Sequence, residues 1–237
     1  MNAKEGAARI LGRIEAVYVP THRYVTVNAR DFGHLDLAYY DKVQRYLESQ
    51  GFRWIGDKEN LTLSEAPGGI FHRVLIRVLV SADGKICAAL YHPKIKSGWL
   101  RIRRFIRGKR LGRVVDFASE FSDGSFSITS NAAVAGKMSL PKQIRSEFLV
   151  RDTPAETVLI RHRAKLAVQT QAPDVHHRLV QSYDESIAMQ NRMNALKSAH
   201  RGEIGGITRE ELDAISPEHP EVVERVHQEI EILRATR

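Results

Sequence analysis

The clearest pattern in the chain is a strict alternation of side chains over residues 73–80. Val74, Ile76, Val78 and Val80 alternate with Arg73, Leu75, Arg77 and Leu79. This period of two predicts a β-strand. Asp83-Gly84 and the apolar run Ile86–Tyr91 come next. An Asp-Gly pair between two strand-like runs predicts a hairpin with a type I′ turn, in which both central residues have positive φ.

The same arrangement recurs about 40 residues later. Asp123-Gly124 separates Val114–Phe121 from Phe126–Thr129. Two such hairpins predict a four-stranded antiparallel meander, and one matching pair is too little to indicate a repeat. Residues 93–113 then form the connection between the two hairpins.

The flanking segments before the first hairpin predict helices and short strands. Asp36 is placed to cap a helix that runs through Ser49, with Leu37, Tyr40, Val43 and Leu47 three and four residues apart, and Gly51 ends it. A short helix is predicted within Ala7–Ala16. Short extended pieces are predicted at Tyr24–Val27, Phe52–Ile55 and Leu61–Leu63.

After Asn131 the pattern becomes helical. Lys142–Phe148 predicts one or two turns, Thr153-Pro154 opens a clear helix, and another helix is expected from about Asp174 toward His200. Thr208 to Glu211 forms a capping box, and Ser216-Pro217 indicates a further helix start. In the last helix Val223, Val226, Ile230 and Leu233 form an apolar stripe. This stripe must pack on the body or on a partner, and we predict a partner-docking helix here.

These elements predict an α+β fold. We expect a mainly antiparallel sheet of four to six strands, built from the two Asp-Gly hairpins and packed on helices. The predicted organisation is an N-terminal segment (1–35), an α+β sheet domain with a basic connection at 93–113 (36–152), and a C-terminal helical region (153–237).

Three short motifs resemble an uncharacterised family of bacterial domains. They are GFRWIGD at 51–57, EFSDGSFSITSN at 120–131 and LIRHRAKLA at 159–167. The resemblance covers about residues 40–167. It implies the same division between sheet and helices, and it implies no activity or ligand.

Charge is unevenly distributed along the chain. The 237 residues include 36 Lys and Arg against 28 Asp and Glu, a net charge of +8 with a pI near 9.7. Residues 93–113 alone hold nine basic residues and no acidic one, whereas residues 172–237 hold eight basic and 12 acidic residues. The body is therefore close to neutral, and one connection supplies the net charge.

Large apolar residues lie among the charges of this connection, which we call the basic segment. Its predicted binding residues are Lys94, Lys96, Trp99, Arg101, Arg103, Arg104, Phe105, Arg107, Lys109 and Arg110. A helix of this kind suits a membrane interface, with cations toward lipid phosphates. The same charges and aromatic rings suit nucleic acid. A third interpretation pairs the arginines with the acidic C-terminal helices.

Catalytic and metal signatures are weak in this sequence. It contains no HExxH, paired CxxC, EF-hand or Gly-x-Ser-x-Gly motif. Cys87, the single cysteine, lies in an apolar strand pattern and is predicted to be an inert buried thiol. His162 lies on an apolar helix face and is predicted to be a hydrogen-bonded core or interface histidine. The carboxylate pairs Asp116 with Glu120 and Asp57 with Glu59 are predicted to face solvent.

The composition and motifs together favour a non-catalytic cytoplasmic binding or adaptor protein without cofactor or metal, peripheral at a membrane. Nucleic-acid binding through the same basic segment is the first alternative. An enzyme whose site is assembled from Asp116, Glu120, His72, His92 and His162 is the second. The expected partners are an anionic membrane surface or nucleic acid, and a protein or second copy at the C-terminal helices. The N-terminal sequence lacks the apolar core of a signal peptide.

Overall fold

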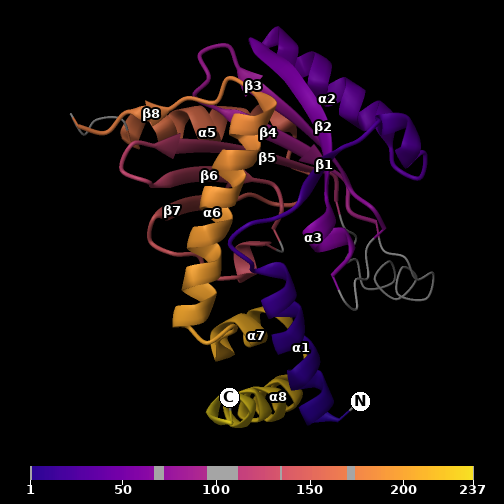
Figure 1. Ribbon diagram of the computed structural model, residues 1–237, viewed down its shortest axis with the longest axis vertical. Helices are drawn as coiled ribbons and strands as arrows, with labels where there is room; N and C mark the ends of the chain where they lie inside the picture. The colour runs from indigo at the N-terminus through magenta and orange to yellow at the C-terminus, as the bar shows by residue number, and fades with distance from the viewer. Residues whose placement is uncertain (1, 67–71, 95–111, 134, 170–173, 237) are drawn as a thin grey trace.

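Seven strands of the sheet lie side by side in the order in which they occur in the chain (Figure 1). The computed structural model describes residues 2–66, 72–94, 112–133, 135–169 and 174–236. The strands are β1 (Tyr24–Thr26), β2 (Phe52–Asn60), β3 (Leu75–Ser81), β4 (Cys87–Tyr91), β5 (Val114–Phe121), β6 (Phe126–Ser130), β7 (Ile144–Phe148) and β8 (His177–Arg178). β1 to β6 pair antiparallel, β7 runs parallel to β6, and β8 pairs with β5. The predicted α+β class is confirmed, with a larger sheet than expected.

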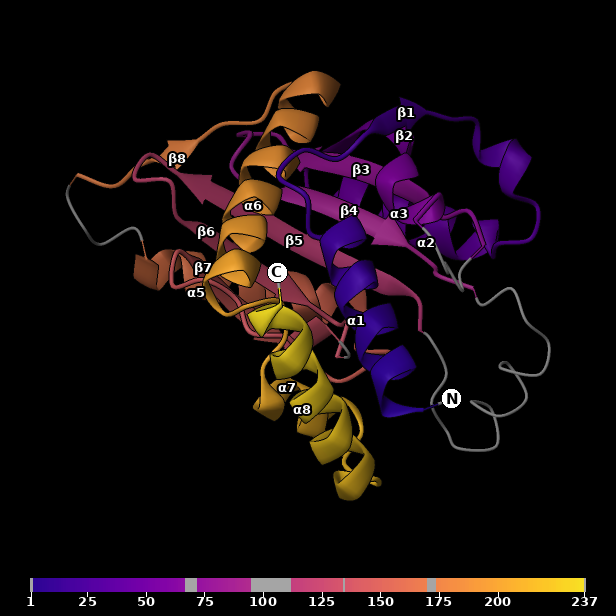
Figure 2. The ribbon, with the colours of Figure 1, turned by 60° about the horizontal axis from the view of Figure 1, so that its bottom comes forward.

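Helices cover both faces of this sheet and extend beyond it (Figure 2). They are α1 (Ala3–Val17), α2 (Leu37–Ser49), α3 (Leu61–Ser64), α5 (Ala155–Gln169), α6 (Tyr183–Glu203), α7 (Arg209–Ile215) and α8 (Pro220–Ala235), with 3-10 turns η1 (Ala29–Phe32) and η2 (Ala135–Lys137). Asp36 caps α2 by accepting from the Tyr39 backbone N–H, as predicted. No helix among the described residues combines the length and apolar character needed to cross a bilayer.

The two sheet faces differ in how they are covered. α2 and α5 pack on one face, where Leu47, Phe117 and Leu159 belong to one buried cluster. α6 crosses the other face diagonally, and its Met189 and Met193 pack on Phe126, Ile128 and Ile144 (Figure 2). Because α5 belongs to the main core, the helices that follow residue 153 do not form a separate layer.

α1, α7 and α8 make a further cluster at the end of α6. The stripe predicted to dock a partner is buried here against α1 of the same chain, because Val223, Val226 and Ile230 meet Ala7 and Leu11. Leu233 packs at the edge of the same cluster. The stripe is thus used inside the molecule, and association of these helices with a partner stays a prediction.

Both Asp-Gly hairpins are present, but their turns differ from the prediction. Gly84 and Gly124 have φ of +72° and +78°, whereas neither Asp83 nor Asp123 has positive φ. The N–H of Gly84 donates to the Ser81 carbonyl oxygen at 2.8 Å, and the Ser81 N–H donates to that of Ile86 at 2.9 Å. These loops are therefore longer than two residues and need only one left-handed position, which glycine supplies.

Three local predictions were wrong. Lys142–Phe148 contains β7 rather than a helix, since Ile144–Phe148 pairs in parallel with β6. Leu61–Leu63 forms a helical turn capped by Asn60. The helix expected from Asp174 starts at Tyr183, where Ser182 and Glu185 form a capping box.

Candidate functional site

The basic segment leaves the sheet at the end of its central strands. Tyr91 of β4 pairs with Val114 of β5, and the chain between them contains the segment. Lys94 lies within the described residues. The other predicted binding residues, Lys96, Trp99, Arg101, Arg103, Arg104, Phe105, Arg107, Lys109 and Arg110, lie outside them.

The two ends of the segment are tied to the body. Arg113 forms an ion pair with Asp36, and its guanidinium lies 5.2 Å from the ring centre of Tyr39. Lys94 donates from Nζ to the carbonyl oxygen of His34, and its own carbonyl oxygen accepts from the His72 N–H at 2.8 Å. The segment is therefore held at both ends against the N-terminal end of α2.

Three histidines, His34, His72 and His92, lie near the point where the basic segment joins the body. The rings of His34 and His72 lie 5.3 Å apart, and His34 Nε2 is 3.0 Å from the carbonyl oxygen of Arg73. Burial lowers the pKa of His92, and the charges of Lys94 and Arg113 lower it further. His92 Nδ1 is buried without a hydrogen-bond partner among the described residues. The surroundings are electropositive, and no set of three or more His, Cys, Asp or Glu suited to a metal occurs in the described part of the chain.

Four acidic side chains of the C-terminal helices form ion pairs with nearby arginines. Glu211 pairs with Arg201 at 2.7 Å, and both side chains are buried. Arg209 pairs with Asp213 at 2.9 Å and with Glu224. Glu231 pairs with Arg234. These carboxylates are already used within α6, α7 and α8.

Three of the four carboxylates considered for catalysis are buried and paired with arginines. Glu120 is 1% exposed and accepts from Arg192 Nε at 2.6 Å and from Arg178 Nη1 at 3.1 Å. Asp57 and Glu59 are likewise buried and pair with Arg77 and Arg73. The prediction that these carboxylates face solvent was wrong, because arginines distant in the sequence satisfy them inside the fold.

Asp116 differs from the other three carboxylates because hydroxyl groups, rather than arginines, donate hydrogen bonds to it. It shares a face of β5 with Glu120, and it accepts hydrogen bonds from Tyr91 Oη at 2.8 Å and from Ser130 Oγ. Burial raises its pKa. The structure does not bring it together with His162, which belongs to the opposite face of the sheet.

His162 is a core histidine, as predicted. It is fully buried, with Nε2 3.1 Å from Ser119 Oγ and Nδ1 3.0 Å from Thr129 Oγ1. Burial, followed by the charge of Lys165, lowers its pKa to about 3. Burial also raises the pKa of the Cys87 thiol, which agrees with an inert cysteine.

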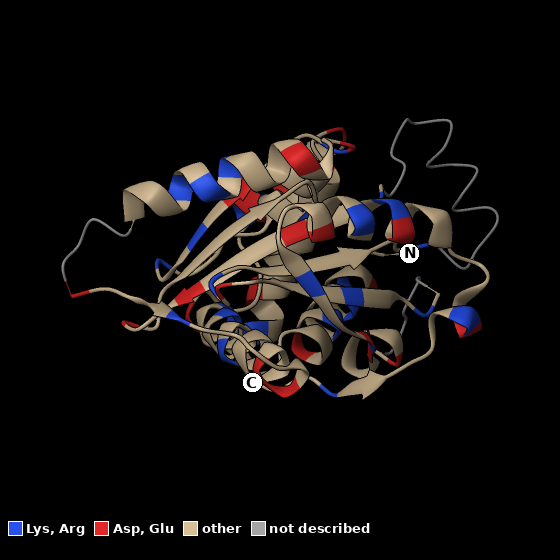
Figure 3. Cartoon of the chain, turned by 90° about the horizontal axis from the view of Figure 1, so that it is seen from above, with Lys and Arg blue, Asp and Glu red and all other residues tan. Residues whose placement is uncertain are grey.

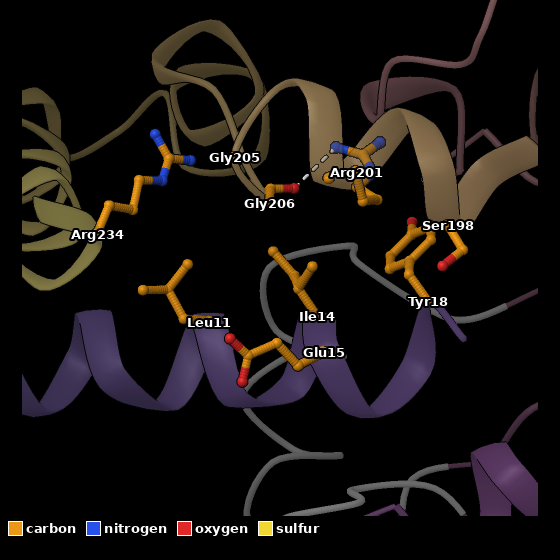
Figure 4. A pocket seen from close by; sticks show the side chains of 10 residues that line it. Leu11, Ile14, Glu15, Tyr18, Ser198, Arg201, Gly205, Gly206 and Arg234 are labelled. Atoms are coloured by element: carbon orange, nitrogen blue, oxygen red, sulfur yellow. Dashed lines mark hydrogen bonds between the residues drawn. The ribbon is translucent and has the colours of Figure 1, made fainter. Parts of the chain in front are cut away.

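A cavity of about 310 Å³ lies between α1, the end of α6 and α8 (Figure 4). Leu11 and Ile14 form its apolar wall, and Tyr18 stacks on Arg201 with the guanidinium 4.9 Å from the ring centre. Arg201 is committed to Glu211, and Arg234 donates to the carbonyl oxygens of Ile204 and Ile207. The arginines here connect helices, so the cavity offers little free charge to a ligand.

Two lysines that the sequence did not single out lie on the α6 face of the sheet. Lys58 of β2 is 4% exposed, and Lys197 of α6 lies near Asp116. Residues 57–60 read Asp-Lys-Glu-Asn, a polar run whose composition predicts a solvated strand end, so no local signal marks Lys58. Lys197 resembles any surface lysine of an amphipathic helix.

Comparison with known proteins adds no relative. No protein-family model matches the chain, and no match was found among curated proteins or solved structures.

Proposed function

We propose that this chain is a non-catalytic binding protein that attaches to an anionic membrane surface through its basic segment. The observation that carries the proposal is the charge balance of the rest of the molecule. Seven of the 36 Lys and Arg lie between residues 96 and 110 and one is Arg237, so the described residues hold 28 basic and 28 acidic side chains. Figure 3 shows both signs interspersed over the described chain. The excess charge belongs to the segment.

The C-terminal pairs support an external partner for the segment. Four of the 12 C-terminal acids, Glu211, Asp213, Glu224 and Glu231, would have to leave Arg201, Arg209 and Arg234 in order to neutralise the segment. Breaking the buried pair of Arg201 with Glu211 alone would cost about 3–5 kcal/mol. An anionic surface outside the protein requires no such loss.

Membrane lipid is favoured over nucleic acid by the apolar content of the segment. Trp99, Ile102, Phe105 and Ile106 accompany the cations, whereas side chains that read base edges are few. Each Lys or Arg near an anionic leaflet contributes about 1 kcal/mol.

Sedimentation with vesicles of phosphatidylserine and phosphatidylcholine tests the proposal. The wild type should bind the anionic vesicles and not pure phosphatidylcholine. A variant with Arg101, Arg103, Arg104 and Arg107 changed to Glu should bind at least about a hundredfold more weakly. A control with the same change of charge at four exposed positions, Arg9, Lys42, Lys142 and Arg225, should keep most of the binding.

Equal binding of the two charge variants would contradict the proposal. Absence of binding to anionic vesicles, together with a DNA or RNA affinity whose log–log salt dependence has a slope of several units, would move the assignment to nucleic acid.

A further inference from the structure

The cavity between α1, the end of α6 and α8 has the size of a site for a small molecule. An engineered cavity of about 150 Å³ with apolar walls binds benzene, so a cavity of about 310 Å³ suits a molecule of two or three rings. Two of the lining residues, Glu15 and Gly202, are exposed, and a ligand can therefore enter between α1 and α6.

The wall that α1 contributes to this cavity is apolar. Figure 4 shows Leu11 and Ile14 pointing from α1 toward Gly206, in the turn between α6 and α7. A Cβ on Gly206 would lie 3.3 Å from Leu11 Cδ2 and 3.9 Å from Ile14 Cγ2, so the backbone of the turn meets this wall directly. The ring of Tyr18 continues the wall toward the end of α6. These surfaces favour contact with an apolar ligand.

The two arginines beside the cavity are committed to partners within the protein. Arg201 belongs to a buried ion pair and also donates to the Gly206 carbonyl oxygen at 3.2 Å (Figure 4). Arg234 donates to the Ile207 carbonyl oxygen at 2.8 Å. A Cβ on Gly205 would lie 2.8 Å from Arg234 Nε, so the backbone of Gly205 covers this side of the guanidinium. A charged ligand would lose water here without gaining an ion pair with either arginine, which favours an uncharged one.

Ser198 of α6 supplies a hydroxyl group that is open to a ligand. Its side chain lines the cavity beside Tyr18 (Figure 4), and its Oγ forms no hydrogen bond with a described residue. A hydroxyl both donates and accepts, so it can orient a ligand that carries one polar group.

Gly202 leaves space at the mouth of the cavity. It follows Ser198 by one turn and lies on the same side of α6. Its φ is not positive, and a Cβ there would meet no atom within 4 Å. Neither backbone conformation nor packing therefore requires glycine, although glycine destabilises a helix relative to alanine. A larger side chain at this position would occupy the space beside Ser198.

We propose that this cavity binds an uncharged, mainly apolar molecule of two or three rings that carries one hydrogen-bonding group. Leu11, Ile14 and the ring of Tyr18 contact its apolar part, and Ser198 bonds to its polar group. Gly202 keeps the entrance open. The inference is independent of membrane binding, because the described residues that line the cavity lie outside the basic segment.

Fluorescence titration of the full chain with phenylnaphthylamine tests this site. The probe is uncharged, carries one N–H group and becomes bright in apolar surroundings. Wild type should bind it with a Kd of about 100 µM or tighter, and naphthol should displace it. Gly202→Leu should weaken binding about tenfold or more, because the new side chain fills the entrance. Gly12→Leu is the matched control, since Gly12 is an exposed helical glycine that does not line the cavity and whose Cβ would also meet no atom within 4 Å.

Ser198→Ala tests the polar contact by displacement of the same probe. It should weaken naphthol about two- to tenfold, the loss of one neutral hydrogen bond, and leave naphthalene unchanged. Circular dichroism and thermal unfolding check the fold of each variant.

Several results would overturn the inference. They are no saturable binding of the probe to wild type, equal affinity in Gly202→Leu and Gly12→Leu, or tighter binding of the charged analogues naphthoate or naphthylmethylamine than of naphthol. If Gly202→Leu does not fold, Ser198→Ala decides the question. Equal effects of Ser198→Ala on naphthol and naphthalene would then refute the proposed site.

Discussion

His162 should lower the free energy of unfolding of this protein in mild acid, by an amount that follows from the lowered pKa of its buried ring. Its pKa is lowered from 6.5 to about 3 in the folded chain. The unfolded chain therefore binds the proton first, and stability is lost as the pH falls from about 6.5 toward 3. Between about pH 7 and pH 4.5 the unfolded imidazole becomes protonated and the folded one does not. This lowers the free energy of unfolding by about 2.5 kcal/mol.

Urea unfolding followed by circular dichroism at several pH values measures this effect. His162→Gln removes the titrating group and keeps an amide between Ser119 and Thr129. The difference in unfolding free energy between wild type and this variant should change by about 2.5 kcal/mol over that pH range, since all other groups are common to both. His176→Gln, at an exposed position, controls for the loss of one imidazole. Parallel pH profiles for wild type and His162→Gln would refute the reasoning.

Two further pairs of variants test other features of the fold by urea unfolding. Glu120→Gln should cost about 2–3 kcal/mol because it weakens a buried acceptor for two arginines. Glu65→Gln, in an exposed pair with Arg23, should cost under about 1 kcal/mol, and equal costs would contradict the role of burial. Gly84→Ala should destabilise by about 1 kcal/mol or more, since φ is +72° and a Cβ would lie 3.1 Å from the Val180 carbonyl oxygen. Gly12→Ala, within α1 and free of contacts, should instead stabilise by about 0.5–1 kcal/mol, and a loss of stability there would contradict this account.

Local sequence pattern predicted the elements whose signals are local. The alternation over residues 73–80, the Asp36 cap and the capping box at Thr208 all correspond to observed elements. β7 was mistaken for a helix because an edge strand of five residues has too few positions to separate period two from period 3.6. Its pairing with β6 is decided by tertiary contact, which composition does not contain.

Buried charge was the main feature that the sequence could not predict. Asp57 and Glu120 were expected in solvent because charged strand residues usually are. The arginines that satisfy them lie 20 and 72 residues away. Without knowledge of which segments meet, a paired buried carboxylate and a solvated one have the same sequence pattern. The same limit conceals the burial of Lys58, which is 4% exposed.

Both faces of the sheet hold a buried carboxylate that an arginine satisfies, Asp57 with Arg77 on the α2 face and Glu120 with Arg192 on the α6 face. On the α2 face, Arg77 holds Asp57 through two hydrogen bonds of 2.9 and 3.0 Å and also reaches Asp41. On the α6 face, the Nζ of Lys58 lies 4.6 Å from the ring centre of Tyr24, and no described carboxylate forms an ion pair with it. Lys58→Met removes one charge outside the segment and should leave vesicle binding unchanged. Loss of vesicle binding in Lys58→Met would contradict the assignment of membrane binding to the basic segment.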